Sequence, residues 1–124
     1  MDNQKTLSAS NIRYLLTMKE LDKSGKGIRC IDIAAALKLS KPSVHNMMNT
    51  FMEMGLVIKE AYGIVIFTDI GRYTAQQYSR YYNLVADILK NNFPKLKNVR
   101  MATCSLLSEI PEGSLEELCS KKAE

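Results

Sequence analysis

The fold is decided by residues 31–55, which read IDIAAALKLSKPSVHNMMNTFMEMG. Apolar residues recur at helical spacing over 31–37, and a second helical pattern follows after a turn of only three residues. A turn this short makes the two helices cross steeply. We expect Ser40 to be the N-cap of the second helix, Pro42 to lie in its first turn and Gly55 to follow its end. The stretch therefore predicts a helix-turn-helix.

The second of these helices has two faces of different chemistry. Its apolar residues predict a buried stripe, and its other side carries small polar residues. Short polar side chains early in a helix let it approach base edges in the major groove of B-DNA, which is about 12 Å wide. The buried stripe is expected to contain Val44, Met47, Met48, Phe51 and Met54. Expected DNA contacts on this helix are Ser40, Lys41, Pro42, Ser43, Asn46 and Asn49.

Regular elements are expected on both sides of this stretch. Residues 10–22 have apolar residues at helical spacing and predict a preceding helix. After Gly55, two β-prone runs at 57–59 and 64–67 are joined by a short connection, which predicts a hairpin with its tip near residue 63. The order helix, helix, turn, helix and hairpin is that of a winged helix-turn-helix. In the hairpin, the expected DNA contacts are Lys59 and Tyr62.

The second half of the chain predicts further helices. Thr68 is expected to cap a long helix that ends before Pro94, and two shorter helices are expected at 99–108 and 115–121. Ser114 and Glu117 have the spacing of a capping box at the start of the last helix, after a break at Pro111 and Gly113. The long helix is expected to present one stripe, made of Ile70, Tyr73, Gln77, Tyr81, Leu84, Val85 and Ile88. Its tyrosines, Tyr73, Tyr78, Tyr81 and Tyr82, are candidates for subunit contacts.

These patterns predict a mainly α fold, in which a winged helix-turn-helix is followed by a helical dimerisation region. We expect the DNA-binding domain in residues 8–72 and the dimerisation region in residues 73–124. No tract of low complexity separates the two.

Composition limits the function classes. The 124 residues carry a net charge of +4, and most of the excess lies in the first half, which suits a polyanionic partner. No apolar run approaches the ~18 residues of a membrane helix, and the start of the chain lacks an apolar signal core, so we expect a cytoplasmic protein with no membrane partner. Three widely spaced cysteines predict reduced thiols. Since His45, the single histidine, lacks a catalytic partner, we expect no enzyme.

Several short motifs resemble one family of regulators. They are IDIAAAL at 31–37, SKPSV at 40–44, MGLV at 54–57 and Phe67-Thr68 with Gly71, together with Tyr14-Leu15-Leu16 in the first helix. In these motifs the chain resembles the diphtheria toxin repressor family of iron- and manganese-dependent transcriptional regulators. The resemblance implies a homodimeric DNA-binding regulator of the short form, without the additional C-terminal SH3-like domain of longer members.

The resemblance does not extend to the metal ligands. It implies a divalent metal held by carboxylates of the first helix, a histidine of the long helix and a cluster on the next helix. This chain has Arg13, Leu16, Tyr82, Met101, Cys104 and Ser105 at those positions, so we expect a degenerate site and predict no cofactor. Arg13 could instead pair with Glu109. Cys104 and Met101 could hold a soft ion such as copper(I).

Together these observations predict a transcriptional regulator, and more specifically a repressor, that binds double-stranded DNA as a homodimer on an inverted-repeat operator. Two alternatives remain open. The winged helix could bind another protein, or the regulator could sense a small organic ligand. Salt-dependent binding to duplex DNA distinguishes a DNA-binding protein from the first alternative, because neutralised phosphates release counterions. A thermal-shift screen of ligands addresses the second.

Overall fold

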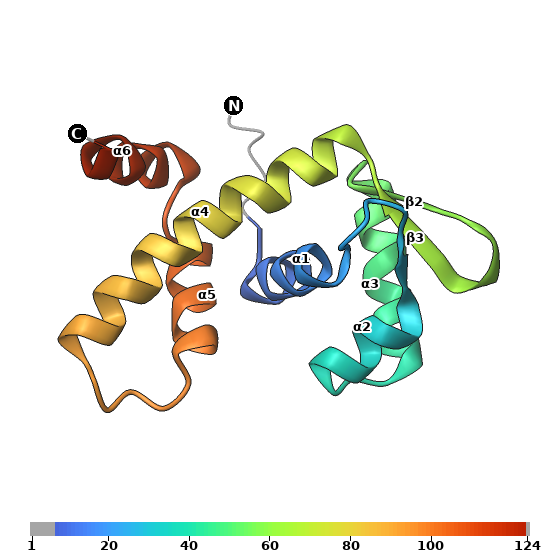
Figure 1. The fold of residues 1–124 in the computed structure, drawn as a ribbon, viewed down its shortest axis with the longest axis horizontal. Coiled ribbons are helices and arrows are strands. Elements are labelled where there is room, and N and C mark those ends of the chain that lie inside the picture. The colour runs from blue at the N-terminus through green and yellow to red at the C-terminus, as the bar shows by residue number, and fades with distance from the viewer. Residues whose placement is uncertain (1–6, 124) are drawn as a thin grey trace. The chain divides into compact units, whose positions relative to one another are not determined.

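The computed structural model describes residues 7–123, with side chains through Lys121, and consists of helices and one small sheet (Figure 1). The chain divides into two compact units, one of residues 14–76 and the other of residues up to 13 together with those from 77 onward. The predicted mainly α, winged helix-turn-helix fold is confirmed. In chain order the elements are α1 (Ala9–Leu21), β1 (Ile28–Arg29), α2 (Cys30–Leu37), α3 (Lys41–Glu53), β2 (Val57–Lys59), the 3-10 turn η1 (Ala61–Gly63), β3 (Ile64–Phe67), α4 (Asp69–Asn92), α5 (Val99–Glu109) and α6 (Glu112–Ala123).

The turn between α2 and α3 forms as the sequence predicts. Lys38 ends α2 in the left-handed region, with φ of 57°, and its N–H points back to the carbonyls of Ala34 and Ala35. Ser40 then caps α3, because its Oγ accepts a hydrogen bond from the Ser43 N–H at 3.2 Å. Pro42 lies in the first turn of α3, where its missing N–H costs no hydrogen bond. The direction of α3 is thus fixed at its N-terminal end.

The end of α3 is joined closely to the start of α4. Gly55 adopts φ of 77°, and the Leu56 N–H donates to the Phe51 carbonyl at 2.9 Å. Thr68 caps α4 by accepting from the Gly71 N–H at 3.0 Å, and its hydroxyl donates to the Gly55 carbonyl at 2.6 Å. A Cβ on Gly71 would overlap the Leu56 carbonyl. Only glycine therefore allows this approach.

The sheet has three antiparallel strands in the order β1-β3-β2. The hairpin of β2 and β3 matches the predicted strands, pairs Lys59 with Val65, and extends from the helices as a wing (Figure 1). Strand β1, which pairs Ile28 with Val65, was not predicted from the sequence. A strand of two residues shows no periodicity, so only its partner strand reveals it. Gly27 allows the close pairing, since a Cβ there would lie 2.7 Å from the Ile64 Cγ2.

The core of the unit of residues 14–76 is built around α3. Tyr14 and Phe51 meet edge to face, with ring centroids 6.2 Å apart. Of the predicted α3 stripe, Val44, Met48 and Phe51 are buried. Met47 and Met54 are only half-buried, so the prediction that the whole stripe is buried was wrong for these two. They lie at the margins of the apolar stripe, where a long flexible side chain covers the edge of the core.

The predicted stripe of α4 needs a larger correction. Ile70, Tyr73 and Ile88 are exposed by 64%, 59% and 46%, whereas Tyr81 and Val85 are buried. Of the four tyrosines expected as subunit contacts, Tyr78 and Tyr81 are buried within the chain itself, so that expectation was wrong for these two. The buried side chains of α4 also include Ala75, Tyr78, Ala86 and Leu89. Apolar residues occupy more than one side of this helix, so helical spacing alone could not select the face that packs inward.

The last helix begins earlier than predicted. The N–H groups of Ser114 and Leu115 both donate to the Pro111 carbonyl, at 3.0 and 3.1 Å, so the first turn of α6 already contains Gly113. The predicted capping box of Ser114 and Glu117 is therefore wrong, because Ser114 lies inside the helix. The proline carbonyl supplies the first acceptor instead.

The unit that includes α6 is held by a buried tyrosine pair. Tyr78 and Tyr81 pack edge to face at 5.1 Å, and the Tyr81 hydroxyl donates to the carboxylates of Glu112 and Glu116. Burial, with a smaller effect of the Glu112 charge, raises the pKa of Tyr78 to about 12. Within residues 7–123, no helix is both long and apolar enough to cross a bilayer.

Candidate nucleic-acid interface

The N-terminal half of α3 exposes a continuous polar surface. Lys41, Pro42, Ser43, His45 and Asn46 are all exposed. Asn49, also predicted as a contact, lies further along the helix and is half-buried. Apart from Asn49, the contacts predicted on this helix lie together at its N-terminal end, next to the Ser40 cap.

Not every predicted contact is equally available there. Besides accepting from the Ser43 N–H, the Ser40 hydroxyl donates to the Ser43 Oγ at 3.0 Å. The Ser40 hydroxyl is therefore occupied by the cap, and the Ser43 hydroxyl still has its own hydrogen to donate. The Asn46 side-chain amide makes no hydrogen bond to another residue within 7–123, although the Asn46 carbonyl accepts from the Thr50 hydroxyl. Asn46 therefore keeps a free donor and a free acceptor on an exposed helix face.

The wing lies beside this end of α3. The Lys59 Nζ, on β2, is 3.4 Å from the His45 Nδ1, on α3. Tyr62 lies at the tip of the hairpin, 98% exposed, in the left-handed region with φ of 64°. His45 was not predicted as a contact from the sequence. Because its partner is 14 residues away in the chain, spacing gave no signal for this pairing.

A groove with a volume of about 500 Å³ separates the wing from the starts of α2 and α3. Its charged lining is mostly basic: Arg29, Lys41 and Lys59 face the single acid Glu60 among the lining residues. Such a concentration of cations attracts polyanions and raises their rate of association. Arg29 was not predicted as a contact, because it lies on the strand β1 that the sequence analysis missed.

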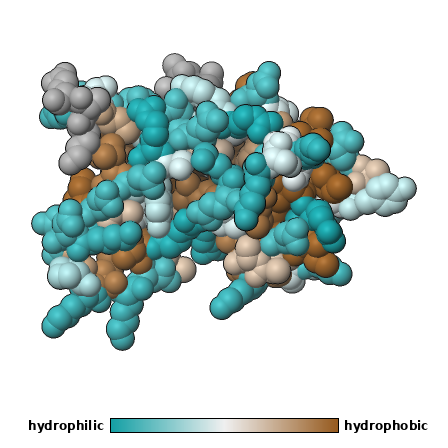
Figure 2. Space-filling model, viewed as in Figure 1, coloured by the Kyte–Doolittle hydropathy of each residue, from teal (hydrophilic) through white to brown (hydrophobic). Residues whose placement is uncertain are grey.

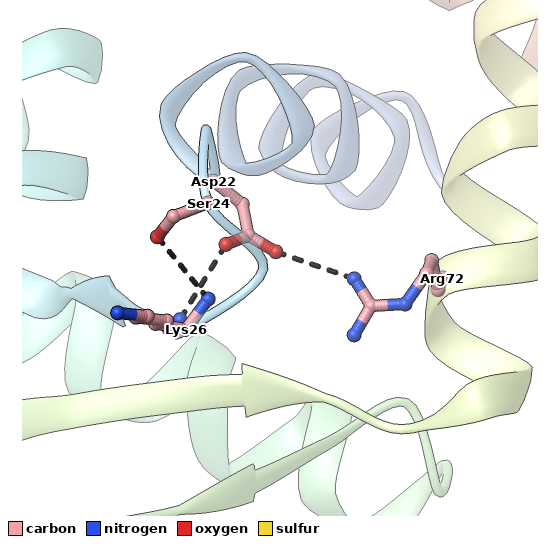
Figure 3. A network of polar contacts seen from close by, with 5 residues as sticks. Asp22, Ser24, Lys26 and Arg72 are labelled. Carbon is pink, nitrogen blue, oxygen red and sulfur yellow. Dashed lines mark hydrogen bonds and ion pairs between the residues drawn. The ribbon is translucent and has the colours of Figure 1, made fainter.

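A buried carboxylate holds the loop that leads into β1 (Figure 3). The Asp22 side chain, only 5% exposed, pairs with the Arg72 Nη1 at 3.4 Å and accepts from the Gly27 N–H at the same distance. The Ser24 hydroxyl accepts from the Lys26 N–H in the same loop. In Figure 3, Arg72 extends from α4 toward Asp22. This network fixes the strand that carries Arg29, and so supports the basic side of the groove.

The positions at which the resemblance implies metal ligands do not supply a fitting donor set. The Arg13 Nε is buried with no hydrogen-bond partner among the described residues, and Leu16 is buried apolar surface. Tyr82 lies under the Arg100 guanidinium, 5.1 Å from it, and Ser105 is exposed. Manganese and iron(II) prefer carboxylates and imidazoles, which none of these residues offers.

The structure does not support the two alternatives for this region, a soft-metal site at Cys104 and Met101 and an ion pair between Arg13 and Glu109. Burial raises the pKa of the Cys104 thiol, and the nearby charges of Arg100 and Arg13 oppose that rise only in part. Met101 is 51% exposed whereas Cys104 is 1% exposed, so the two sulfurs do not form one buried soft-metal site. Arg13 and Glu109 form no ion pair in the part of the chain that the structure describes. No group of three or more His, Cys, Asp or Glu side chains assembles within residues 7–123.

A known domain family matches the part of the chain that contains this candidate interface. Residues 13–61 match the IclR helix-turn-helix domain, which spans α1 to the start of η1. None of the curated proteins matches the chain closely enough to count as a relative. The matched segment is thus similar to the winged helix-turn-helix domain of the IclR type.

Solved structures extend the likeness over most of the chain. The hypothetical protein SSo2273 from Sulfolobus solfataricus is 27% identical, with a TM-score of 0.63 over 93% of this chain and 88% of that one. The manganese regulator SloR is 21% identical with a TM-score of 0.73, covering 96% of this chain and 55% of that one. IdeR from T. acidophilum is 17% identical with a TM-score of 0.67, covering 98% and 56%. The chain thus spans just over half the length of the last two, which share its fold. The helix-turn-helix match supports a DNA-binding domain, and the solved structures share the fold of the chain.

Proposed function

We propose that this protein is a transcriptional regulator that binds duplex DNA with α3 in the major groove. One observation carries the proposal: the start of α3 exposes Ser43 and Asn46 beside a wing whose groove is lined by Arg29, Lys41 and Lys59. Short polar side chains read base edges, and cations beside them bind phosphates. In this arrangement one helix end presents both kinds of contact.

Asn46 is the residue to which we assign base reading. A side-chain amide pairs bidentately with adenine, through its carbonyl oxygen and its amino group. Asn46 is exposed and uncommitted, whereas Ser40 is held by the cap. Lys41 and Lys59 are assigned to the phosphates, because flexible ammonium groups contact the backbone without reading sequence. Tyr62, at the wing tip, is assigned to the adjacent backbone or groove.

We further propose a homodimer formed through the helices of the second half, residues 73–124, with α4 contributing from its start. Ile70 and Tyr73 lie three residues apart on α4 and are exposed by 64% and 59%. Exposed apolar and aromatic groups at this spacing are typical of subunit contacts. A two-fold dimer presents two recognition helices, so the operator is an inverted repeat. Blocking access to a promoter through such an operator would make the protein a repressor.

The proposal does not include regulation by manganese or iron at the positions implied by the resemblance. SloR is described as a manganese regulator, but that property does not transfer, because this chain has Arg13, Leu16, Tyr82 and Ser105 where hard ligands are implied. The guanidinium of Arg13 is a cation and repels a dication.

The test is selection of duplexes from a random library by the full-length chain, followed by fluorescence anisotropy with the enriched and a scrambled duplex. We expect enrichment of a site with dyad symmetry and binding that weakens steeply as salt rises. Failure to enrich any duplex, with no difference between enriched and scrambled DNA at low salt, would contradict DNA binding. Enrichment of a site without a dyad would contradict the dimer alone.

A further inference from the structure

The groove between the wing and the starts of α2 and α3 is more than a basic surface. Its volume of about 500 Å³ lies within the ~300 to 1,000 Å³ typical of small-molecule sites. Part of its lining is apolar: Ile31 is 51% exposed and Ile64 is half-buried, above the buried side chains of Val44 and Val65. Phosphate groups of a DNA backbone bind cations and amide donors, and contact with an apolar surface does not stabilise them. The groove therefore has a feature that DNA binding does not explain.

The charged groups of the groove define what else it could hold. Arg29, Lys41 and Lys59 supply three cations, and Glu60 is the one acid among the lining residues. The contact between Lys59 and His45 joins the wing to α3 on the same side. A ligand that satisfies both the cations and the apolar lining must carry a negative charge on an apolar body. A hydrated inorganic ion would leave the apolar lining unused.

We propose that this groove binds a small organic anion, with an acidic group toward Lys41 and Lys59 and an apolar ring against Ile31 and Ile64. The site lies entirely within the unit of residues 14–76. Its occupancy does not depend on DNA binding. Its consequence for DNA does rest on the proposed function: Lys41 and Lys59 serve both ligands, so the bound anion competes with duplex DNA.

The protein contains its own reporter for this site. Cys30, the first residue of α2, is half-buried and lines the groove, whereas Cys104 and Cys119 are 1% and 8% exposed in the other unit. A ligand in the groove covers the Cys30 thiol and slows its alkylation by iodoacetamide. Peptide mass spectrometry measures the three cysteines separately, so the two buried thiols are internal controls.

The first experiment titrates the full-length protein with 1-anilinonaphthalene-8-sulfonate, an aromatic anion that fluoresces in apolar surroundings, and displaces it with benzoate. We expect one site per chain and slower alkylation of Cys30 alone. Lys59→Gln should weaken binding about tenfold through loss of a charged contact, and Ile31→Ser about fivefold through loss of apolar surface. Both side chains are exposed, so both variants should fold.

Matched controls remove the same chemistry elsewhere on the surface. Lys97→Gln and Leu96→Ser lie between α4 and α5, at exposed positions, and should leave the affinity for the dye unchanged. Equal loss in the groove and control variants, or alkylation of Cys30 that the dye does not slow, would overturn the proposal. Displacement by inorganic phosphate as effective as that by benzoate would also overturn it, because a phosphate uses only the cations.

The second experiment adds the dye to a complex of the protein with its selected duplex. We expect release of the DNA from the wild type at dye concentrations that fill the groove, and release from Ile31→Ser only at about fivefold higher concentration. A filled groove with DNA still bound would overturn the competition. If no duplex binds at all, the proposed function fails, and the ligand site is judged on the dye titration and Cys30 protection alone.

Discussion

Helices α3 and α4 leave different kinds of surface uncovered. At its start, α3 exposes Ser43, His45 and Asn46, whereas α4 exposes Ile70 and Tyr73 near its own start. Figure 2 shows that hydrophilic side chains cover most of the visible face and that hydrophobic patches interrupt them. A polar exposed face has hydrogen bonds to offer to a hydrated polyanion, and an apolar one gains only by leaving water. We therefore assign the face of α3 to DNA and that of α4 to a second subunit.

The largest expected effect is on stability, at the close approach between the start of α4 and the segment that follows α3. Gly71→Ala places a Cβ on the Leu56 carbonyl, so α4 must move away from the segment that follows α3. We expect a loss of about 3 kcal/mol or more in the free energy of unfolding, measured by urea titration. Gly113→Ala is the control, since nothing lies within 4 Å of its Cβ in α6. An equal loss in both variants would contradict the close approach.

The apolar face of α4 is tested by placing a charge on it. Tyr73→Glu should weaken the dimer by about 2 kcal/mol or more, or roughly 30-fold in dissociation constant, because a desolvated aromatic contact is replaced by a carboxylate. Gln76→Glu adds the same charge at another exposed position of α4 and should have little effect. Sedimentation equilibrium measures both. A wild-type protein that is monomeric at tens of micromolar would contradict the assignment of the exposed α4 face to a second subunit.

The polar face of α3 is tested by its uncommitted amide. Asn46→Ala should reduce the preference for the selected duplex over scrambled DNA by about 1 to 3 kcal/mol, through loss of a bidentate base contact. Asn83→Ala removes an exposed amide from α4 and should leave the preference intact. Anisotropy with both duplexes gives the ratio. An unchanged ratio for Asn46→Ala would show that α3 does not read bases through this residue.

Ser40 separates a structural role from a DNA contact on the same helix. Ser40→Ala loses the acceptor for the Ser43 N–H and should cost about 1 kcal/mol of stability. Ser40→Asp keeps that acceptor, so its stability should stay near that of the wild type, while its new charge repels phosphates and weakens DNA binding. Thermal or urea unfolding together with anisotropy distinguishes the two. Equal stability of the Ala and wild-type proteins would contradict the cap.

Local sequence signals were enough to predict most of the unit of residues 14–76. Ser40, Pro42, Gly55 and Thr68 each act within a few residues of their own position, through a cap or a turn, and the structure has all of them where the sequence predicts. The stripe predicted on α4 does not coincide with the buried face of that helix, because Ile70 and Tyr73 have the apolarity of core residues and are nevertheless exposed. Periodicity reports that a face is apolar, and it does not report whether the chain's own core or another molecule covers it.

The candidate interface was predictable only in part, because some of its residues come together through contacts between distant segments. The residues of α3 follow from one helix, but Arg29 belongs to a two-residue strand that forms only by pairing with β3. His45 meets Lys59 across the space between α3 and the wing, and no spacing rule in the sequence describes that contact. Whatever depends on pairing between distant segments, including the groove itself, required the structure.

The salt dependence of duplex binding tests the central claim most directly. Anisotropy titrations of the selected duplex should give a linear fall of log K with log salt concentration, and Lys59→Gln should reduce the slope by about 1, since one phosphate contact is lost. Lys97→Gln, an exposed lysine outside the interface, should leave the slope unchanged. A wild-type slope near zero, or equal slopes for Lys59→Gln and the wild type, would contradict the assignment of the face formed by α3 and the wing to DNA.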